Sequence, residues 1–382
     1  METLPSVLFI YPGEARKVRL DAVKTGEAPK DFFYGLTHIQ EQGFKVAIGN
    51  SRKDPSNVSG QAILYFEKVR NRFLNFGLAS SRVMALADEI AAFDMALSFN
   101  DFFSLSMGLY RNKVKSDTLL MGGFHGLSDI PERVPPAIKG YATQKIIKAL
   151  SGLDHLFFSG EVDRQVAIEK FNIPPEKTSY YPFGVDAGFW HPAKTSIQTG
   201  GILSIGSDIN RDFNTLMQSN VDDPIRIITR LNIEAPTEKS NIEIVRGNLN
   251  QSPITDTSLR ELYQNAELVV VPLQDVWQPT GCSVTLQAMA CGKPVIVSDI
   301  KGLWDRDILK SGTNCLLVPP GNSNALGDAI HLLKRDEELR TRMGIEARKT
   351  VEKHFSISRM EQALETIIRT QAETLSLSKK VI

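Results

Sequence analysis

The most informative stretch of the sequence reads PTGCSVTLQAMACGKPVIV and covers residues 279–297. The apolar run 268–271 before it and the β-branched run 295–297 at its end have the length of buried strands. Between them, small residues at 280–283 precede an apolar segment, 284–291, that is long enough for a helix. The stretch therefore predicts a strand, a helix that begins in a glycine-containing loop, and a second strand parallel to the first.

The same alternation of short strands and helices extends over the whole chain. In the first half the sequence predicts strands at 7–11, 44–48, 95–99, 118–121, 156–159 and 179–181. In the second half it predicts strands at 201–205, 225–229, 242–245, 268–271, 295–297 and 315–318. The predicted helices include 31–43, 81–92, 259–265, 284–291 and 323–335. Each half has enough elements for a doubly wound α/β domain with a parallel sheet.

The length of the chain and a glycine- and proline-rich segment near its middle favour two domains. A chain of 382 residues is too long for a single hydrophobic core. Glycines and prolines cluster at 182–200, just before a new predicted strand. We therefore expect an N-terminal Rossmann-like domain at 1–190 and a C-terminal one at 191–357. A last amphipathic helix, at about 358–382, can pack back on the first domain. We expect the two domains to face each other across a cleft at the carboxyl ends of both sheets.

The composition is that of an ordinary soluble globular protein. Hydrophobic residues make up 42% and charged residues 23%, and 44 basic residues balance 44 acidic ones. We therefore expect no general attraction to nucleic acid. Three cysteines are too few for a disulfide framework or a zinc site. The first residues lack a basic region followed by an apolar one, and the apolar runs are only strand-length. These features predict a cytoplasmic protein.

The loop before the predicted helix 284–291 has the properties of an anion-binding site. Gly281 permits close approach of the backbone, and the first N–H groups of a helix have no partner within it. Such N–H groups and the helix dipole attract phosphate. The candidate donor-binding residues of this loop are Thr280, Gly281, Cys282, Ser283 and Val284. Capping of the helix by Thr280 or Ser283 is an alternative that needs no ligand.

The segment 286–296 closely resembles the carboxyl-half signature of the retaining glycosyltransferases of family 4, which have the GT-B fold. Three further blocks agree in the expected order. Residues 181–192 resemble the interdomain segment, 205–216 the first nucleotide-side loop, and 259–272 the helix and strand before the signature. The resemblance is good over about residues 150–370 and weak before them. It implies a nucleotide-diphosphate sugar as donor substrate and transfer without a metal or another cofactor.

Two positions depart from that family. It usually carries two glutamates eight residues apart, where this chain has Pro279 and Gln287. The second glutamate is implied to bind the ribose of the nucleotide, and Gln287 can still accept a hydrogen bond there. The first is implied to act near the transferred sugar, where Pro279 offers no polar side chain. Asp275 or Gln278 in the same loop can supply hydrogen bonds instead.

The resemblance implies a basic residue shortly after the glycine of the first nucleotide-side loop, Gly206. Arg211 follows Gly206 by five residues, and its guanidinium can grip two phosphate oxygens of a departing diphosphate. An exposed arginine paired with a neighbouring aspartate is the alternative. Ser207 is a further donor-binding candidate. So is Arg230, after the strand 225–229, for which a plain surface position is equally favoured.

In the N-terminal half the candidates are His125 and Gly13. His125 follows a predicted strand in a glycine-rich run, 121–126, and resembles the family's histidine, which is implied to contact the donor sugar. The glycines beside it favour close approach of a ligand, although a lone histidine is often an ordinary polar residue. Gly13 follows the first strand, where the family has a glycine loop near the acceptor. We therefore assign His125 and Arg211 as catalytic candidates and assign no metal ligands.

Residues 45–82 carry seven basic and two acidic side chains, a local charge of +5. Within this segment Phe66, Val69 and Phe73 alternate with basic residues. An amphipathic basic helix of this kind can lie on a membrane surface or hold an anionic acceptor. A solvated face with a buried apolar stripe is the more ordinary interpretation.

Together these features predict a retaining glycosyltransferase that moves a sugar from a nucleotide-diphosphate sugar to an acceptor. The acceptor can be a glycan, a lipid or a small molecule. A nucleotide-sugar epimerase or phosphorylase on the same fold is one alternative, and a catalytically silent sugar-nucleotide binding protein is another. We expect no nucleic-acid partner. A peripheral membrane contact through the segment 45–82 is an option.

Overall fold

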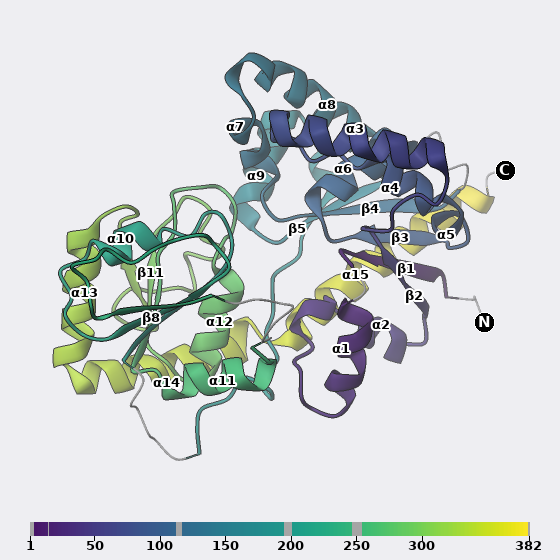
Figure 1. Cartoon of the computed structure of the whole chain (residues 1–382). Helices are drawn as coiled ribbons and strands as arrows, with labels where there is room; N and C mark the ends of the chain where they lie inside the picture. Colours follow the sequence, from purple (N-terminus) through teal and green to yellow (C-terminus); the bar gives the residue numbers. More distant parts are fainter. Residues whose placement is uncertain (1–3, 14, 112–116, 195–200, 247–253, 381–382) are drawn as a thin grey trace. The chain divides into compact units, whose positions relative to one another are not determined.

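The computed structural model of this chain describes residues 4–13, 15–111, 117–194, 201–246 and 254–380. Its internal contacts divide the chain into two compact units. Unit 1 consists of residues 1–21, 33–182 and 361–382, and unit 2 consists of residues 22–32 and 183–360. Each unit has its own sheet (Figure 1).

Unit 1 is built on a six-stranded parallel sheet. Its strands are β1 (Ser6–Tyr11), β2 (Lys45–Asn50), β3 (Met95–Ser98), β4 (Leu119–Phe124), β5 (His155–Phe158) and β6 (Thr178–Tyr180). They lie in the order β2-β1-β3-β4-β5-β6. Strand β1 lies between β2 and β3. Its residue Val7 is opposite Val46 of β2 on one side and Met95 of β3 on the other.

Helices pack around this sheet, and its four inner strands, β1, β3, β4 and β5, are almost wholly buried. The helices are α1 (Ala15–Lys24), α2 (Leu36–Glu41), α3 (Val58–Leu74), α4 (Ser80–Ala85), α5 (Ala87–Ala91), α6 (Asp101–Leu109), α7 (Ile130–Arg133), α8 (Lys139–Ser151) and α9 (Glu161–Phe171). Short 3-10 turns of this unit lie at Leu127–Asp129, Pro136–Ile138 and Pro175–Lys177, and another, Asp31–Phe33, spans the division between the units. The core combines strand residues such as Leu8 and Leu156 with helix residues such as Leu105 and Ile146.

Unit 2 is built on a second six-stranded parallel sheet. Its strands are β7 (Ile202–Ile205), β8 (Ile225–Thr229), β9 (Ile242–Arg246), β10 (Leu268–Val271), β11 (Val295–Ser298) and β12 (Leu316–Val318). The order β12-β11-β10-β7-β8-β9 is that of a Rossmann sheet. The chain leaves β7 toward one edge of the sheet and β10 toward the other. The carboxyl ends of these two strands therefore form a topological switch point, where such folds bind ligands.

The helices of unit 2 pack against this sheet around a core that includes Ile227, Val270, Ile296 and Leu326. They are α10 (Phe213–Met217), α11 (Asp256–Asn265), α12 (Cys282–Ala290), α13 (Ser323–Arg335) and α14 (Glu337–His354). A last helix, α15 (Ile357–Lys380), begins in unit 2, and from Glu361 onward its residues belong to unit 1.

The prediction of two Rossmann-like α/β domains is confirmed, and all twelve predicted strands are present within a few residues. The single predicted helix 31–43 is wrong. Tyr34 and Gly35 have φ values of 50° and 82°, a left-handed backbone that ends the turn at Phe33 before α2 begins. The predicted helix 81–92 is divided into α4 and α5. The division between the units, after Pro182, falls in the glycine- and proline-rich segment 182–200.

Candidate functional site

The centre of the candidate site is Arg211, which lies at the switch point of unit 2. Its backbone forms a bridge with Leu273, just after β10, and Asp212 donates its N–H to the carbonyl of Pro272 at 3.0 Å. The loop after β7 is thereby fixed beside the loop after β10. Two loops that are far apart in the sequence thus meet at the topological switch point between β7 and β10.

Two glycines make room for the Arg211 side chain. A Cβ atom at Gly206 would lie 2.0 Å from Nε of Arg211, and one at Gly281 would lie 3.1 Å from Nη1. Gly281 also has a φ of 80°, which other residues rarely adopt. The predicted residues Gly206, Arg211 and Gly281 are therefore brought together, with the guanidinium packed between the two glycines.

The guanidinium of Arg211 is buried without a full set of partners. Only 7% of the residue is exposed. Within the part of the chain that the structure describes, its Nε and Nη1 atoms have no hydrogen-bond partner. Burial lowers the pKa of Arg211 to about 10, and the nearby Asp208 opposes that shift. The expected alternative, an exposed arginine in a surface ion pair, does not fit this environment. A buried cation lacking partners is costly, so an anion that supplied acceptors would be held strongly.

Asp208 organises the loop beside Arg211. Its carboxylate accepts a hydrogen bond from the backbone of Asn210 at 2.8 Å, from Oγ1 of Thr280 at 3.2 Å and from Nε2 of Gln278 at 3.2 Å. Asn210 in turn donates to Oε1 of Gln278 at 3.1 Å. The loop after β7 and the loop before α12 are thus joined by side chains, which holds Arg211 and the start of α12 in one place.

Helix α12 begins next to the Arg211 guanidinium. Its N-cap residue is Gly281, which makes no side-chain cap, and Thr280 gives its hydroxyl hydrogen to Asp208. Cys282 and Val284 are buried, whereas Ser283 is half-buried, so the first turn reaches the protein surface. Oriented N–H groups beside an arginine form an arrangement suited to a phosphate group.

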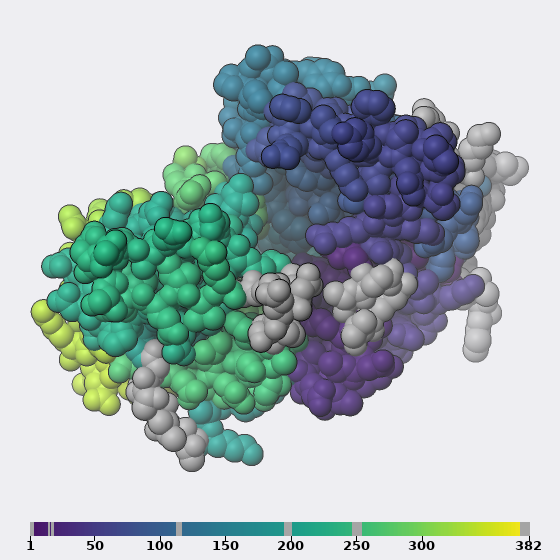
Figure 2. Space-filling view, viewed as in Figure 1, coloured from purple at the N-terminus to yellow at the C-terminus, as the bar shows by residue number. Residues whose placement is uncertain are grey.

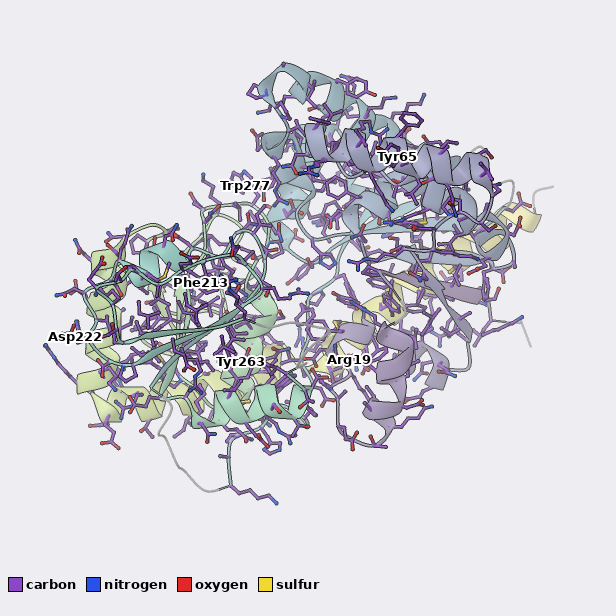
Figure 3. The ribbon with its side chains drawn as sticks, viewed as in Figure 1. Arg19, Tyr65, Phe213, Asp222, Tyr263 and Trp277 are labelled. Atoms are coloured by element: carbon purple, nitrogen blue, oxygen red, sulfur yellow. The ribbon has the colours of Figure 1, made fainter. Side chains whose placement is uncertain are left out.

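Gln287 lies farther along α12 and is engaged inside the unit. It is 2% exposed, and its Nε2 donates to the carboxylate of Asp31 at 3.3 Å. Its Oε1 accepts a hydrogen bond from the hydroxyl of Tyr263, labelled in Figure 3, at 3.4 Å. The amide is therefore part of a buried network rather than directed to solvent.

Asp31 is the centre of that network, and sequence reasoning missed it. Its carboxylate also accepts hydrogen bonds from the backbone N–H of Asp186 at 2.6 Å and from Nε1 of Trp190 at 2.7 Å. Burial raises its pKa to about 7, although these hydrogen bonds lower it. No local signal marks Asp31, because its partners are more than 150 residues away and the segment 22–32 joins unit 2 from the first part of the chain.

The other predicted residues of unit 2 lie in the loops after β7, β8 and β10. Oγ of Ser207 accepts a hydrogen bond from the backbone N–H of Arg230 at 2.9 Å, and Arg230 is exposed. Asp275, considered as a substitute for the missing glutamate, accepts the backbone N–H of Lys301 at 2.9 Å and pairs with its Nζ at 3.1 Å. Gln278, the other substitute, is held by Asp208 and Asn210.

In unit 1, His125 follows β4 and is half-buried. Its Nδ1 lies 2.9 Å from Oγ of Ser159, and its backbone N–H donates to Asp101 at 2.9 Å. The following turn is fixed by Asp163, which accepts the backbone N–H groups of Leu127 and Ser128. Sequence reasoning missed Asp101, Ser159 and Asp163, which hold the His125 loop in place.

The glycines near His125 have a different role from the expected one. A Cβ at Gly122 would lie 2.7 Å from Leu153, and one at Gly123 would lie 2.4 Å from the ring of Phe157. These two glycines therefore accommodate the core of unit 1 rather than a ligand. Gly13, the other candidate of this unit, has a φ of 91° and donates its N–H to Oδ1 of Asn50 at 2.9 Å.

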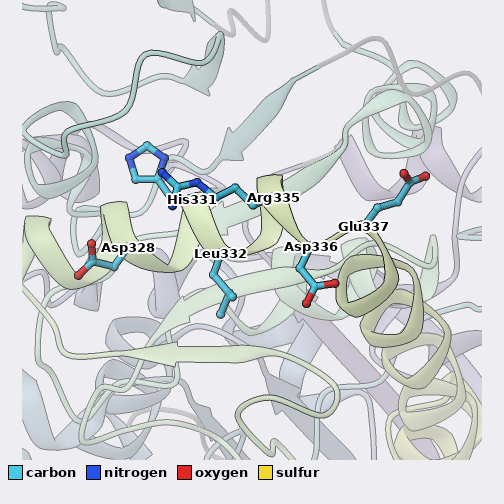
Figure 4. Close-up of a pocket in the computed structure, with 6 residues that line it drawn as sticks. All are labelled: Asp328, His331, Leu332, Arg335, Asp336 and Glu337. Atoms are coloured by element: carbon cyan, nitrogen blue, oxygen red, sulfur yellow. The ribbon is translucent and has the colours of Figure 1, made fainter.

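A separate hollow lies where α13 meets α14 and has a volume of about 600 Å³ (Figure 4). It is lined by Asp328, His331, Leu332, Arg335, Asp336 and Glu337. None of the predicted site residues lines it, and Nε2 of His331 lies 2.7 Å from the carbonyl oxygen of Asn220. We assign no chemistry to this hollow.

Comparison with known proteins indicates the class. Residues 249–350 match the family glycosyl transferases group 1. An uncharacterized glycosyltransferase of Methanocaldococcus jannaschii is 33% identical over 103 residues, which are 27% of this chain and 25% of that protein. The matched part is thus about a quarter of the length of the curated relatives. The family match contains the predicted loop and helix at 279–291.

Two solved structures resemble the whole chain. Sucrose-phosphate synthase from Thermosynechococcus elongatus has a TM-score of 0.70 at 15% identity. The match covers 97% of this chain and 99% of the synthase chain. HepE of Anabaena, in complex with UDP and glucose, has a TM-score of 0.66 at 14% identity, with the same two coverages. The predicted GT-B fold is confirmed, as is the resemblance to the glycosyl transferases group 1.

Among the described residues, no helix is both long and apolar enough to span a membrane. Among the same residues, no group of three or more His, Cys, Asp or Glu side chains has an arrangement that could hold a metal ion.

Proposed function

We propose that this protein is a retaining glycosyltransferase that transfers a sugar from a nucleotide-diphosphate sugar without a metal. The observation that carries the proposal is the buried guanidinium of Arg211 between Gly206 and the start of α12. Its Nε and Nη1 atoms have no hydrogen-bond partner among the described residues. The match of residues 249–350 to the glycosyl transferases group 1 supports it. So does the similarity in fold to HepE of Anabaena, solved with UDP and glucose.

In this proposal Arg211 and the first turn of α12 bind the diphosphate of the donor. Negative charge grows on the diphosphate as its bond to the sugar breaks. Cationic and N–H donors that are already in place therefore stabilise the transition state more than the bound donor. The Asp208 network contributes by fixing both loops before the substrate arrives, so little reorganisation is needed during the reaction.

The other residues have supporting roles. His125 orients the transferred sugar from unit 1, with its ring held by Ser159. Gln287 supports donor binding indirectly. Its hydrogen bonds with Asp31 and Tyr263 hold helix α12 in place. The acceptor binds to the first unit, near the loop of Gly13. As the resemblance to family 4 implies, an oxygen of the departing diphosphate takes the proton of the acceptor hydroxyl, which then attacks the sugar from the same face.

The acceptor is a glycan, a lipid or a small molecule carrying a nucleophilic group, and we propose a cytoplasmic location for the reaction. A contact of the segment 45–82 with a membrane accords with this function. It is not required by the function, because the donor-binding residues belong to unit 2.

A thermal-shift screen with UDP-, GDP-, ADP- and TDP-sugars tests the proposal. A ligand that binds only the folded protein at about 100 times its Kd stabilises it by about 2.7 kcal/mol. We expect one nucleotide class to raise the melting temperature, and the same donor to be consumed slowly by hydrolysis and faster with a suitable acceptor. If no nucleotide sugar changes the melting temperature, the donor site is wrong.

A second candidate function is sugar-nucleotide binding without transfer. It is favoured by Pro279 in place of the usual glutamate and by the engagement of Gln287 with Asp31. Tight binding of a donor that is neither transferred nor hydrolysed would support this alternative. An anomeric analysis of any product would show whether the configuration is retained.

A further inference from the structure

Helix α3 of unit 1 has an unusual distribution of polar and apolar residues. Its inward stripe contains Leu64 and Leu74, but also the buried Glu67 and the half-buried Asn71. Glu67 accepts hydrogen bonds from the backbone N–H and the hydroxyl of Ser81, and Nδ2 of Asn71 donates to the carbonyl of Leu78. Half of the inward stripe is therefore polar and is held by hydrogen bonds rather than by hydrophobic contact.

The outward face of α3 is apolar and aromatic. The exposed fractions are 88% for Val58, 65% for Tyr65, 71% for Phe66, 39% for Val69 and 76% for Phe73. At about 100° per residue these side chains share one arc of roughly 100°, opposite the inward stripe. The helix lies along the surface of unit 1 in Figure 2, and Tyr65 is labelled on it in Figure 3. The buried apolar stripe that the sequence favoured does not include Phe66, Val69 or Phe73.

Basic residues flank this apolar arc. Lys68 and Arg72 lie on one side of it and Arg70 on the other, and all three are exposed. Glu67 is the only acidic residue in the sequence of α3, and it points inward. Nζ of Lys68 lies 3.7 Å from the carboxylate of Asp54, and Nη2 of Arg70 donates to the carbonyl of Leu78 at 3.2 Å, so two of these charges are partly engaged within unit 1. The outward face combines large apolar side chains with basic residues on both borders.

We infer that the outward face of α3 binds the surface of an anionic phospholipid bilayer. The helix would lie in the plane of the interface, with Phe66 and Phe73 at the level of the acyl chains. Lys68, Arg70 and Arg72 would be among the headgroup phosphates. A second copy of this chain fits the face less well, because the basic borders of two such helices would repel each other. This inference concerns unit 1 and does not depend on the proposed transfer reaction.

Sedimentation of the full-length protein with lipid vesicles tests this inference. We expect binding to vesicles of phosphatidylcholine mixed with phosphatidylglycerol, and much weaker binding to phosphatidylcholine alone. The variant Phe66→Ser/Phe73→Ser should bind the mixed vesicles at least about tenfold more weakly. Lys68→Gln/Arg72→Gln should lose about tenfold on mixed vesicles at low salt and little at high salt.

The matched control is Tyr141→Ser, which removes an aromatic side chain that is 57% exposed on α8 of the same unit. It should bind vesicles like the unmodified protein, and the melting temperatures of all variants should stay close together. Three results would overturn the inference. They are no binding of the unmodified protein to mixed vesicles, an equal loss in Tyr141→Ser, or an oligomer that dissociates in Phe66→Ser/Phe73→Ser.

Discussion

Arg211 and Asp31 are both buried ionisable residues of unit 2, yet their surroundings are opposite. Asp31 accepts hydrogen bonds from Asp186, Trp190 and Gln287, so its carboxylate is satisfied by the protein itself. Arg211 is equally enclosed, but its Nε and Nη1 have no partner among the described residues. A satisfied buried charge is typical of a structural element, whereas an incompletely satisfied one at a topological switch point is a candidate for binding a ligand. By this comparison, Asp31 stabilises the structure around the candidate site, whereas Arg211 is the residue proposed to bind the ligand.

The largest effect is expected when the satisfied network is given a second charge. Gln287→Glu restores the residue usual in family 4, but it places a carboxylate where an amide now donates to Asp31. Two buried carboxylates at that distance repel each other, and we expect a loss of about 2–4 kcal/mol in the free energy of unfolding near neutral pH. Denaturant unfolding measures this loss.

The double variant Asp31→Asn/Gln287→Glu is the control for that prediction. It exchanges the amide and the carboxylate, so part of the lost stability should return. Complete restoration is not expected, because the introduced asparagine side chain would have one acceptor oxygen for two donors, the N–H of Asp186 and Nε1 of Trp190. If the double variant is as unstable as the sum of its single changes, Asp31 and Gln287 are not coupled.

The next effect concerns the glycines that make room for the Arg211 side chain. Gly206→Ala introduces a Cβ that would lie 2.0 Å from Nε, so the guanidinium must move. We expect the affinity for a nucleoside diphosphate to fall by about 1–3 kcal/mol, or roughly 5- to 150-fold. Titration calorimetry compares it with Gly327→Ala in α13, where the nearest atom would be at 3.5 Å and affinity should be unchanged.

A further effect, spread over several pH units, is the pH dependence of stability. The pKa of Asp31 is raised to about 7 in the folded protein, from about 3.8 when unfolded. The folded state therefore binds more protons between these values, and stability should fall as the pH rises from about 4 to about 7. The slope that Asp31 contributes is about 1.4 kcal/mol per pH unit at most. Asp163 of unit 1, with its pKa also raised to about 7, should add a similar slope.

Unfolding of the unmodified protein and of Asp31→Asn at several pH values separates the two aspartates. The variant should lose the part of the slope that comes from unit 2 and keep the part that comes from Asp163. An unchanged slope in Asp31→Asn would mean that this carboxyl titrates normally in the folded chain.

The smallest effect is expected from removing the hydrogen bond between Ser159 and His125. Ser159→Ala removes the hydroxyl 2.9 Å from Nδ1 but leaves the ring in place. We expect transfer to slow by a few-fold, in line with the loss of one hydrogen bond of about 1 kcal/mol, and nucleotide affinity to stay unchanged. By comparison, His125→Ala should abolish most transfer with affinity retained. Steady-state kinetics with titration of the nucleotide distinguishes these outcomes from misfolding.

Much of the fold could be predicted because it depends on local patterns. Buried parallel strands are evident from short apolar runs of sequence, such as all of β10 and the first three residues of β11. The helix 31–43 was mispredicted because a left-handed turn at Tyr34 leaves little trace in side-chain periodicity. The position of Arg211 near Gly206 was predictable from its spacing and from the resemblance, whereas its role in binding the diphosphate stays a proposal.

The support of the site could not be predicted from local sequence. Asp31 reaches Gln287 across more than 250 residues, and only folding shows that the segment 22–32 belongs to unit 2. The α3 face is a similar case. Its alternation of aromatic and basic residues was visible, but not that Glu67 points inward while Phe66 and Phe73 point outward.

The central claim is that Arg211 is the cation that binds the diphosphate. Its most direct test is titration calorimetry of Arg211→Gln with UDP, GDP or ADP, whichever binds the unmodified protein. Arg226→Gln, at an exposed arginine paired with Glu243 in the same unit, is the control. We predict that Arg211→Gln loses about 5- to 150-fold in affinity while its melting temperature is kept or raised, because a buried charge is removed. Equal affinity in Arg211→Gln and Arg226→Gln would contradict the account.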